Sequence, residues 1–309
     1  RRNDMKKLSI LFIATLLLLS GCSLEAPGWA KKERKVDVKD ITIGVSISTL
    51  NNPFFVSVKD GITKEAKKQG ITVKIADAQN DSSKQSNDVD DLIQQGVDVL
   101  LVNPVDSAAI SSAVKTANDA AIPVIAIDRS ADKGKVETLV ASDNREGGKM
   151  AAQYILDQLG DEAKVAELEG VPGASATRER GEGFHSLADT KLDVVEKQSA
   201  DFDRTKGLNV AENVLQANSS IQAIFAQNDE MALGAVEAAK SAGKDIIIVG
   251  FDGNDDGLKA VETGKMSATI AQQPELIGKK AVESVKDVAA GKKIEALIPV
   301  ELKLVTGEK

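Results

Sequence analysis

The sequence predicts an α/β fold made of two similar lobes, each built on a doubly wound parallel sheet. Three observations indicate this fold. Short β-branched runs alternate with amphipathic stretches from Ile41 onward. The runs are almost continuously apolar, as in parallel strands that helices cover on both faces. The strand runs are also too numerous for one comfortable sheet, so a second sheet is expected.

Strands and helices are expected in regular alternation along the chain. The expected strands span residues 41–48, 71–78, 97–104, 122–130, 163–170, 192–198, 221–228, 246–253 and 267–273. The expected helices include residues 56–70, 84–96, 110–121, 147–160, 207–219 and 230–243. Several of these helices end in Gly, which tolerates the left-handed conformation at a helix end.

The segment TLVASDNREGG (138–148) marks the expected junction between the lobes. Four strand–helix units are expected before it, and the alternation begins afresh after it. Residues 274–305 are expected to form a long helix and one closing strand. The resulting lobe assignment is 40–142 with 273–301 for the N-terminal lobe, and 143–272 with 302–309 for the C-terminal lobe.

Residues 1–21 have the features of an export signal. Met5 and two lysines precede an apolar run from Leu8 to Leu19, which is shorter than the roughly 20 residues that a membrane-spanning helix needs. A short membrane helix is the alternative. The segment ends in LSGC and resembles the bacterial lipobox, which implies that Cys22 carries a lipid. Residues 22–39 lack periodicity and are interpreted as the tether to the lipid bilayer.

The charge balance of the chain argues against nucleic acid as a partner. The net charge is −8, and residues 1–21 contribute four positive charges and one negative charge, so the remainder carries −11. No basic tract interrupts this acidic body. Cys22 is the single cysteine, so no disulfide is expected. The remaining length is comfortable for two domains.

Aromatic and polar side chains stand where the expected strands end, which is where open parallel sheets bind ligands. These residues are Asn52, Phe54, Phe55, Asn103, Asp128, Arg129, Phe202, Asn228, Phe251, Asp252 and Gln272. The chain has seven Phe, so four of the six that remain without Phe12 belong to this set. Rings that stack on apolar faces and planar groups that bond hydroxyls suit a sugar.

Each of these residues also has a purely structural interpretation. Asn and Asp are common in turns and as helix N-caps, and Pro53 favours a helix start. Phe54 and Phe55 could simply be core residues of the first helix. The binding hypothesis therefore depends on the whole set, because both expected lobes repeat the same arrangement.

Nine segments are similar to those of bacterial ribose-binding proteins in the periplasmic-type sugar-binding family. They are STLNNPFF, NPVDSAA, IDRS, ASDN, RERGEGF, ADFDR, FAQNDEMALGA, VGFDG and ATIAQ, and the similarity extends from residue 40 to about 305. It implies the periplasmic binding protein type I fold, with a sugar held between two lobes that a three-stranded hinge joins. It also implies a monomer, not an enzyme, that delivers D-ribose to the membrane permease of an ATP-driven (ABC) importer. The expected place is the extracytoplasmic face of the cell membrane.

The same resemblance implies specific residue roles. The implied ligand-binding residues are Asn52, Phe54, Phe55, Asn103, Asp128, Arg129, Arg180, Phe202, Asn228, Asp252 and Gln272. Phe54, Phe55 and Phe202 are expected to stack on the sugar, whereas Phe251 shapes the wall. Ser142 and Gln272 fall at implied hinge crossings. Arg180 enters only through the resemblance.

Four alternatives remain open at this point. The single histidine, His185, is expected on a helix rather than in a catalytic site, since no nucleophile elbow or P-loop is visible. The segment DGNDDG (252–257) matches half of a calcium loop, but a turn and helix cap are expected there. A DNA-binding repressor needs a helix-turn-helix where the export signal stands. The last alternative keeps the mechanism with allose or a furanosyl signalling molecule. No cofactor or metal is expected.

Overall fold

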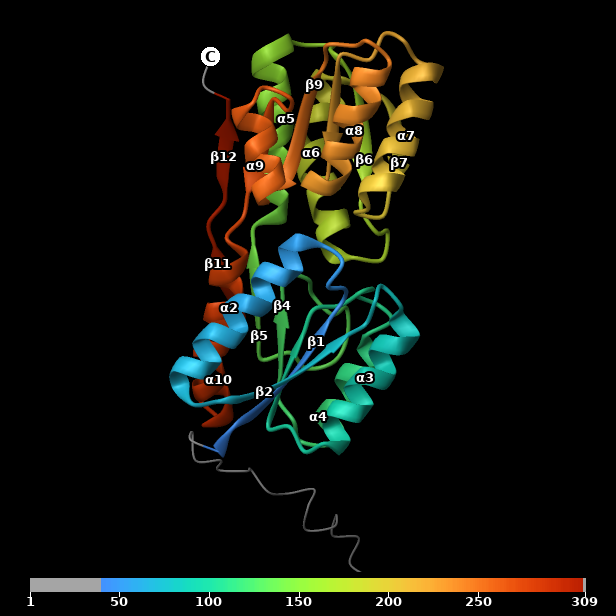
Figure 1. The fold of residues 1–309 in the computed structure, drawn as a ribbon. Helices are drawn as coiled ribbons and strands as arrows, with labels where there is room; N and C mark the ends of the chain where they lie inside the picture. The colour runs from blue at the N-terminus through green and yellow to red at the C-terminus, as the bar shows by residue number, and fades with distance from the viewer. Residues whose placement is uncertain (1–39, 308–309) are drawn as a thin grey trace, which may run out of the picture. The chain divides into compact units, whose positions relative to one another are not determined.

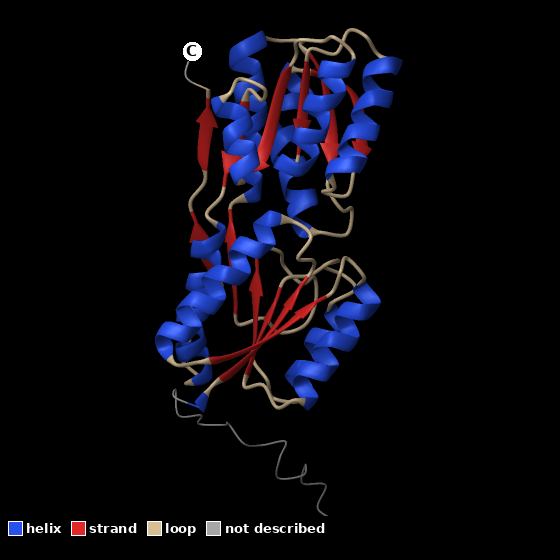
Figure 2. Ribbon diagram, in the orientation of Figure 1, coloured by secondary structure: helices blue, strands red, loops and turns tan. Residues whose placement is uncertain are grey.

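The computed structural model describes residues 40–307, which form two six-stranded sheets with helices packed on their faces (Figures 1 and 2). The expected export signal, Cys22 and the tether lie outside the described residues. Within the described part of the chain, no helix combines the length and the apolar character needed to cross a membrane.

The first sheet has the strand order β2-β1-β3-β4-β5-β11, and all of its pairs are parallel. Its strands are β1 (Thr42–Ile47), β2 (Thr72–Asp77), β3 (Val99–Val102), β4 (Val124–Ile127), β5 (Thr138–Ser142) and β11 (Leu297–Val300). Its helices are α2 (Pro53–Gln69), α3 (Ser82–Gln94), α4 (Ser111–Asp119) and α10 (Pro274–Ala289). The strand order reverses between β1 and β3, which is the point where such sheets bind ligands.

The second sheet repeats this order as β7-β6-β8-β9-β10-β12, with only the β10–β12 pair antiparallel. Its strands are β6 (Lys164–Glu169), β7 (Asp193–Ser199), β8 (Ala223–Ala226), β9 (Ile247–Asp252), β10 (Ala268–Ala271) and β12 (Lys303–Thr306). Its helices are α5 (Asn144–Leu159), α6 (Ser175–Lys191), α7 (Arg204–Ala217), α8 (Asp229–Ser241) and α9 (Asp255–Glu262). The corresponding switch point lies between β6 and β8.

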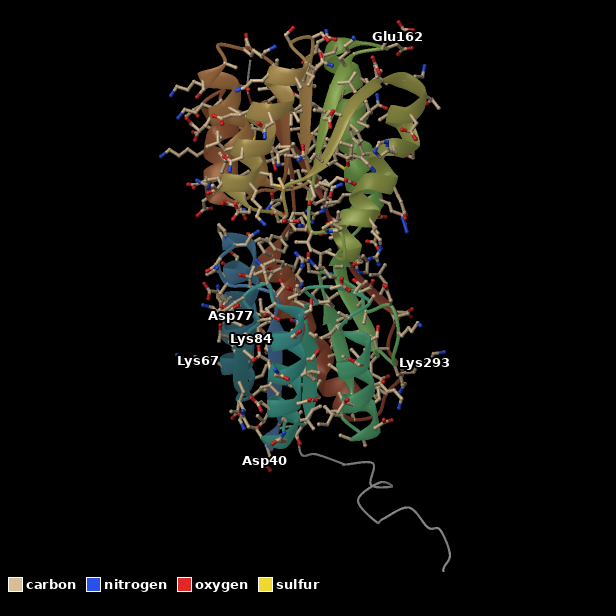
Figure 3. The ribbon with its side chains drawn as sticks, turned by 90° about the vertical axis from the view of Figure 1, so that its right-hand side faces the viewer. Asp40, Lys67, Asp77, Lys84, Glu162 and Lys293 are labelled. Carbon is tan, nitrogen blue, oxygen red and sulfur yellow. The ribbon has the colours of Figure 1, made fainter. Side chains whose placement is uncertain are left out.

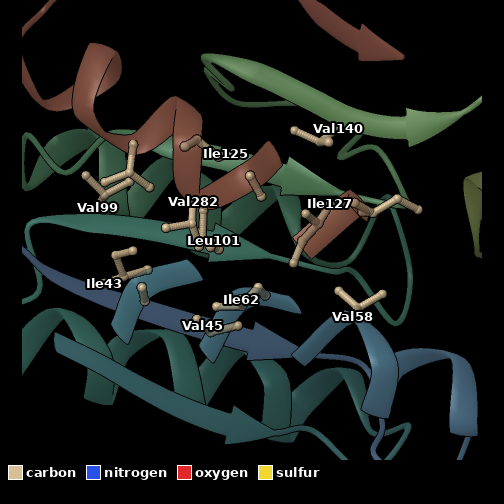
Figure 4. Close-up of a cluster of buried hydrophobic side chains, with 14 of the residues drawn as sticks. Ile43, Val45, Val58, Ile62, Val99, Leu101, Ile125, Ile127, Val140 and Val282 are labelled. Carbon is tan, nitrogen blue, oxygen red and sulfur yellow. The ribbon is translucent and has the colours of Figure 1, made fainter. Parts of the chain in front are cut away.

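The apolar strands form cores with the helices on either side of each sheet. Figure 4 shows Ile43 of β1 and Leu101 of β3 facing Ile62 of α2 and Val282 of α10, and all four side chains are fully buried. On the opposite face of the first sheet, buried residues of α3 and α4 form a separate cluster with β3. Each fully buried Ile or Leu side chain stabilises the fold by about 1.5–3 kcal/mol.

Charged side chains occupy the outer surface of these layers. Figure 3 shows the side chains of Lys67, Glu162 and Lys293, and all three residues are exposed. Lys84, also labelled there, donates hydrogen bonds to the carbonyl oxygen of Asp77 and to Asp88, each at 2.8 Å. These contacts hold the start of α3 beside the end of β2.

Between residues 40 and 307, three chain segments connect the two sheets: β5 to α5, β10 to α10, and β11 to β12. Two details of the expected element order are wrong. The expected fourth strand–helix unit lacks its helix, because the polar segment 130–135 carries no apolar periodicity and Gly134 has a φ of 94°. The single closing strand is divided at Glu301 and Leu302 into β11 and β12, which pair with different sheets.

Candidate functional site

The carboxyl ends of β1, β3 and β4 meet in a hydrogen-bonded cluster centred on Asn103. Its Oδ1 accepts hydrogen bonds from the backbone N of Ser48 at 3.1 Å and from the Ser48 hydroxyl at 2.6 Å. Its Nδ2 donates to the carbonyl oxygen of Ile127 at 3.1 Å and to Oδ2 of Asp128 at 3.4 Å. Asn103 therefore fixes the ends of three strands and orients the carboxylate of Asp128.

In the second sheet, Arg180 of α6 and Asp252 at the end of β9 lie close together. Nε of Arg180 donates to Oδ1 of Asn144 at 2.9 Å, and Nη1 donates to the carbonyl oxygen of Gln227 at 2.5 Å. Nη1 also lies 3.6 Å from Oδ1 of Asp252. The same Asp252 oxygen accepts from Nε2 of Gln272 at 2.9 Å. Asn144 and Gln227 thus hold Arg180, and Gln272 holds Asp252.

Aromatic rings and guanidinium groups connect the two clusters. The guanidinium carbon of Arg129 lies 5.0 Å from the ring centroid of Phe55 and 5.3 Å from that of Phe202. The guanidinium carbon of Arg180 lies 5.8 Å from the ring centroid of Phe202 and 3.7 Å from that of Phe251. These distances lie within the range of cation–π attraction. The residues at the two sets of strand ends therefore form one continuous assembly.

Four buried ionic groups form the centre of this assembly. Asp128 and Arg129 are each 4% exposed, and Arg180 and Asp252 are each 3% exposed. Burial raises the pKa of Asp128 and raises that of Asp252 well above its ordinary value, although Arg129 and Arg180 oppose these shifts. Burial also lowers the pKa of Arg129 to about 10. The ion-pair distances of 3.6 Å exceed hydrogen-bond range, so the pairs offset only part of the desolvation cost.

The backbone is strained at three of these strand ends. The φ angles of Asp128, Phe202 and Asp252 are 64°, 60° and 118°. Non-glycine residues rarely adopt positive φ, and such strain concentrates at binding and catalytic sites. Such a conformation persists only where the surrounding structure enforces it.

Three buried polar atoms of the assembly have no hydrogen-bond partner within residues 40–307. They are Oδ1 of Asp128, Nε of Arg129 and Oε1 of Gln272. Two of these atoms accept hydrogen bonds and one donates. Such atoms are costly to bury, and a bound molecule that both donates and accepts would satisfy them.

A pocket of about 110 Å³ adjoins the assembly. Asn52, Phe55 and Arg129 line it from the first sheet, and Phe202 lines it from the second. Phe202 packs against Gly170 at the end of β6, where an added Cβ would collide with the ring. The pocket therefore has an aromatic wall whose position depends on a small residue.

Some of the expected binding residues also have structural partners. Oδ1 of Asn52 caps α2 by accepting from the backbone N of Phe54 at 2.9 Å. Oδ1 of Asn228 caps α8, and its Nδ2 donates to the carbonyl oxygen of Phe202 at 3.2 Å. Phe54 and Phe55 are 2% and 3% exposed and belong to the first core. Their contact with a ligand stays a prediction.

The structure also places the residues of the competing interpretations. His185 lies on α6, and its Nε2 is 2.8 Å from Oε2 of the fully buried Glu167. Segment 252–257 forms the end of β9, a turn and the start of α9. Between residues 40 and 307, no three His, Cys, Asp or Glu side chains gather as a metal site would require. Ser142 is the last residue of β5, beside the first connection between the sheets.

Sequence reasoning missed Asn144 and Gln227, the two residues that hold Arg180. Gln227 directly follows β8, as Asn103 directly follows β3. Its Oε1 accepts from the backbone N of Gly170 at 3.1 Å, just as Asn103 binds Ser48. The repeat between the two sheets was therefore the signal that could have identified Gln227.

Comparisons with known proteins agree with this architecture. A family model described as a periplasmic binding protein domain matches residues 43–293. The ribose import binding protein RbsB of Bacillus subtilis is 64% identical over 97% of this chain and 99% of its own length. RbsB of Haemophilus influenzae is 52% identical over 98% of this chain and 100% of its own length.

A solved structure shows the same fold. An ABC transporter solute binding protein from Mycobacterium smegmatis with bound glycerol superposes with a TM-score of 0.83 at 32% identity. The match covers 86% of this chain and 94% of the solved one. The expected type I arrangement of two lobes is thereby confirmed. The chain belongs to the periplasmic binding protein domain family.

Proposed function

We propose that this chain is an extracytoplasmic solute-binding protein that captures D-ribose between its two sheets and delivers it to the permease of an ATP-driven importer. The unpartnered atoms of Asp128, Arg129 and Gln272 are the observation that carries this proposal. A sugar hydroxyl both donates and accepts hydrogen bonds, so a polyol meets the needs of all three atoms. The buried Arg180 and Asp252 offer further charged partners nearby.

The aromatic groups support a sugar ring rather than another polar solute. Phe55 and Phe202 flank the guanidinium of Arg129, and Phe202 is only partly buried. Flat rings can cover the apolar faces of a sugar at low entropy cost. We assign ligand contact to the whole set: Asn52, Phe54, Phe55, Asn103, Asp128, Arg129, Arg180, Phe202, Asn228, Asp252 and Gln272.

Direct hydrogen bonds between the two halves of the molecule support a closing mechanism. The backbone N of Ser107 donates to the carbonyl oxygen of Gly173 at 2.9 Å, and the backbone N of Ser130 donates to Oγ of Ser175 at 2.9 Å. Both bonds join residues that follow strands of the first sheet to residues 173–175, at and just before the start of α6. A ligand that engages both halves favours this closed state over an open one. Ser142 and Gln272 are proposed hinge positions.

The relatives support ribose over other sugars. The two ribose import proteins are 64% and 52% identical to this chain, whereas a D-allose-binding protein of Escherichia coli is 36% identical. Transport relatives also support a protein that binds its solute without converting it. Lipidation at Cys22, attachment to the cell membrane and a monomeric state belong to the proposal. So do the lobe boundaries 40–142 with 273–301 and 143–272 with 302–309, which sheet membership supports.

Calorimetric titration with D-ribose tests the proposal. We expect ribose to bind, and we expect Asp252→Ala to abolish binding while the far-ultraviolet dichroism stays unchanged. Tyr154→Phe is the control, because Tyr154 donates to the carbonyl oxygen of Ser267 within the same half, away from the site. Absence of binding by the unmodified protein, or undiminished binding by Asp252→Ala, would contradict the proposal.

A further inference from the structure

Asp229, the first residue of α8, is a fully buried acid outside the proposed ligand-contact set. Its Oδ1 accepts from the Thr269 hydroxyl at 2.7 Å, and its Oδ2 accepts from the backbone N of Asn254 at 2.8 Å. The backbone amide of Gly253 also interacts with this carboxylate and lowers its pKa. Its polar partners are therefore one hydroxyl and two backbone amides, of which the Asn254 amide forms a hydrogen bond.

These two amides belong to the residues that directly follow Asp252. Asp252 has a φ of 118°, a conformation that the surrounding structure must enforce. Its Oδ1 must also stay 2.9 Å from Nε2 of Gln272. By binding the backbone N of Asn254, Asp229 restrains the turn that sets the direction of the Asp252 side chain.

The surroundings of Asp229 accommodate a carboxylate, although burying it carries a desolvation cost. Burial raises the pKa of Asp229 to about 7. The N-terminus of α8 favours negative charge at this position. Gly257 leaves room for the carboxylate, because an added Cβ there would collide with Oδ2. An apolar residue would avoid the desolvation cost but would leave the Asn254 amide without this acceptor.

We propose that Asp229 is a positioning residue for the sugar site, which holds the 253–254 turn so that the Asp252 carboxylate faces the ligand. This inference rests on the proposed function. Asp229 acts only through Asp252 and is not itself expected to touch the sugar. Its influence should therefore depend on its acceptor atoms rather than on its charge.

Three variants separate an effect of the acceptor atoms of Asp229 from an effect of its charge. Asp229→Ala removes both acceptors. Asp229→Asn keeps one oxygen for the turn amides, and its Nδ2 can donate to the Thr269 hydroxyl, which can also accept. Thr269→Val keeps the shape of Thr269 but removes the hydroxyl that orients Asp229. Tyr154→Phe again serves as the control for the loss of a hydrogen bond elsewhere in the same half.

Titration with D-ribose gives the first readout. We expect Asp229→Ala to weaken affinity by about tenfold or more, Asp229→Asn to stay within about threefold of the unmodified protein, and Tyr154→Phe to have no effect. Equal affinity of Asp229→Ala and the unmodified protein would overturn the proposal. So would a loss in Asp229→Asn as large as in Asp229→Ala. If Asp229→Ala does not fold, Thr269→Val must weaken binding by about two- to fivefold, and unchanged affinity overturns the proposal.

Hydrogen exchange without sugar gives a second readout that does not depend on ribose. The amide of Asn254 should exchange faster in Asp229→Ala than in Asp229→Asn, because only the latter still binds it. Equal rates in the two variants would overturn the positioning role. If exchange behaves as expected but the unmodified protein does not bind ribose, the proposed function fails while the structural role of Asp229 stands.

Discussion

The guanidinium carbon of Arg129 lies 5.3 Å from the ring centroid of Phe202, although the two residues follow strands of different sheets. Arg129 follows β4, and Phe202 follows β7. Nη1 of Arg129 also donates to the carbonyl oxygen of Pro104 at 3.0 Å, which holds the guanidinium on the first sheet. The contact therefore depends on both halves and on the position of the Phe202 ring.

Gly170→Ala should weaken ribose binding because it displaces this ring. An added Cβ at Gly170 would collide with three atoms of the Phe202 ring, whereas one at Gly181 meets its nearest atom at 3.4 Å. We expect a loss of about tenfold for Gly170→Ala and no loss for Gly181→Ala, measured by titration. A ribose affinity that is the same in both variants would show that the ring position is unimportant.

2-Deoxyribose should bind at least about tenfold more weakly than ribose, because a missing hydroxyl leaves a buried charged partner unsatisfied at a cost of about 1–3 kcal/mol or more. The excess of buried ionic groups, led by Asp128 and Asp252, motivates this expectation. Parallel titrations of the two sugars provide the measurement. Similar affinities would mean that these groups do not recognise that hydroxyl.

Ser175→Ala should weaken ribose binding, although Ser175 is not among the residues assigned to contact the sugar. Oγ of Ser175 accepts a hydrogen bond from the backbone N of Ser130 in the other half of the molecule. Loss of this bond disfavours the closed state. The net contribution of one hydrogen bond is about 0.5–1.5 kcal/mol, which corresponds to a loss of ribose affinity of about two- to tenfold. Ser186→Ala is the matched control, because Ser186 donates to the carbonyl oxygen of Gly183 within the same helix. An equal effect in both variants would count against closure.

His185 should make stability depend on pH. Its hydrogen bond to Glu167, together with Asp189, raises the pKa of His185 to about 9. Because this folded-state pKa exceeds the ordinary value of 6.5, the stabilisation is fully present below about pH 6.5 and disappears as the pH rises through about 9. The free energy of unfolding is measured with denaturant at pH 6, 7.5 and 9.5 for the unmodified protein and for His185→Gln. The difference between the two proteins should be largest at pH 6. A loss that is constant across this range would refute the assignment.

The sequence predicted the fold class because alternation, apolar strands and helix-ending glycines all indicate the same architecture. The two-lobed fold is confirmed. Details of connection were harder to predict, since a polar loop and a helix of similar length both fit between β4 and β5. The division of the last strand into β11 and β12 depends on pairing with different sheets, which local sequence does not encode.

Most of the proposed ligand-binding residues could be predicted from the sequence, but the residues that position them could not. Asn103, Asp128 and Asp252 could be chosen because they follow strands at the edge where ligands bind. Arg180 was suggested only by resemblance, because it lies inside a helix. Asn144 and Asp229 look like ordinary residues at helix starts, and only long-range contacts reveal what they hold.

A crystal structure of the protein with D-ribose tests the central claim most directly. The account predicts one sugar between the two sheets, within hydrogen-bond distance of Asp128 Oδ1, Arg129 Nε and Gln272 Oε1, with its apolar faces against the rings of Phe55 and Phe202. A sugar bound elsewhere, or one that leaves these three atoms without partners, would contradict it.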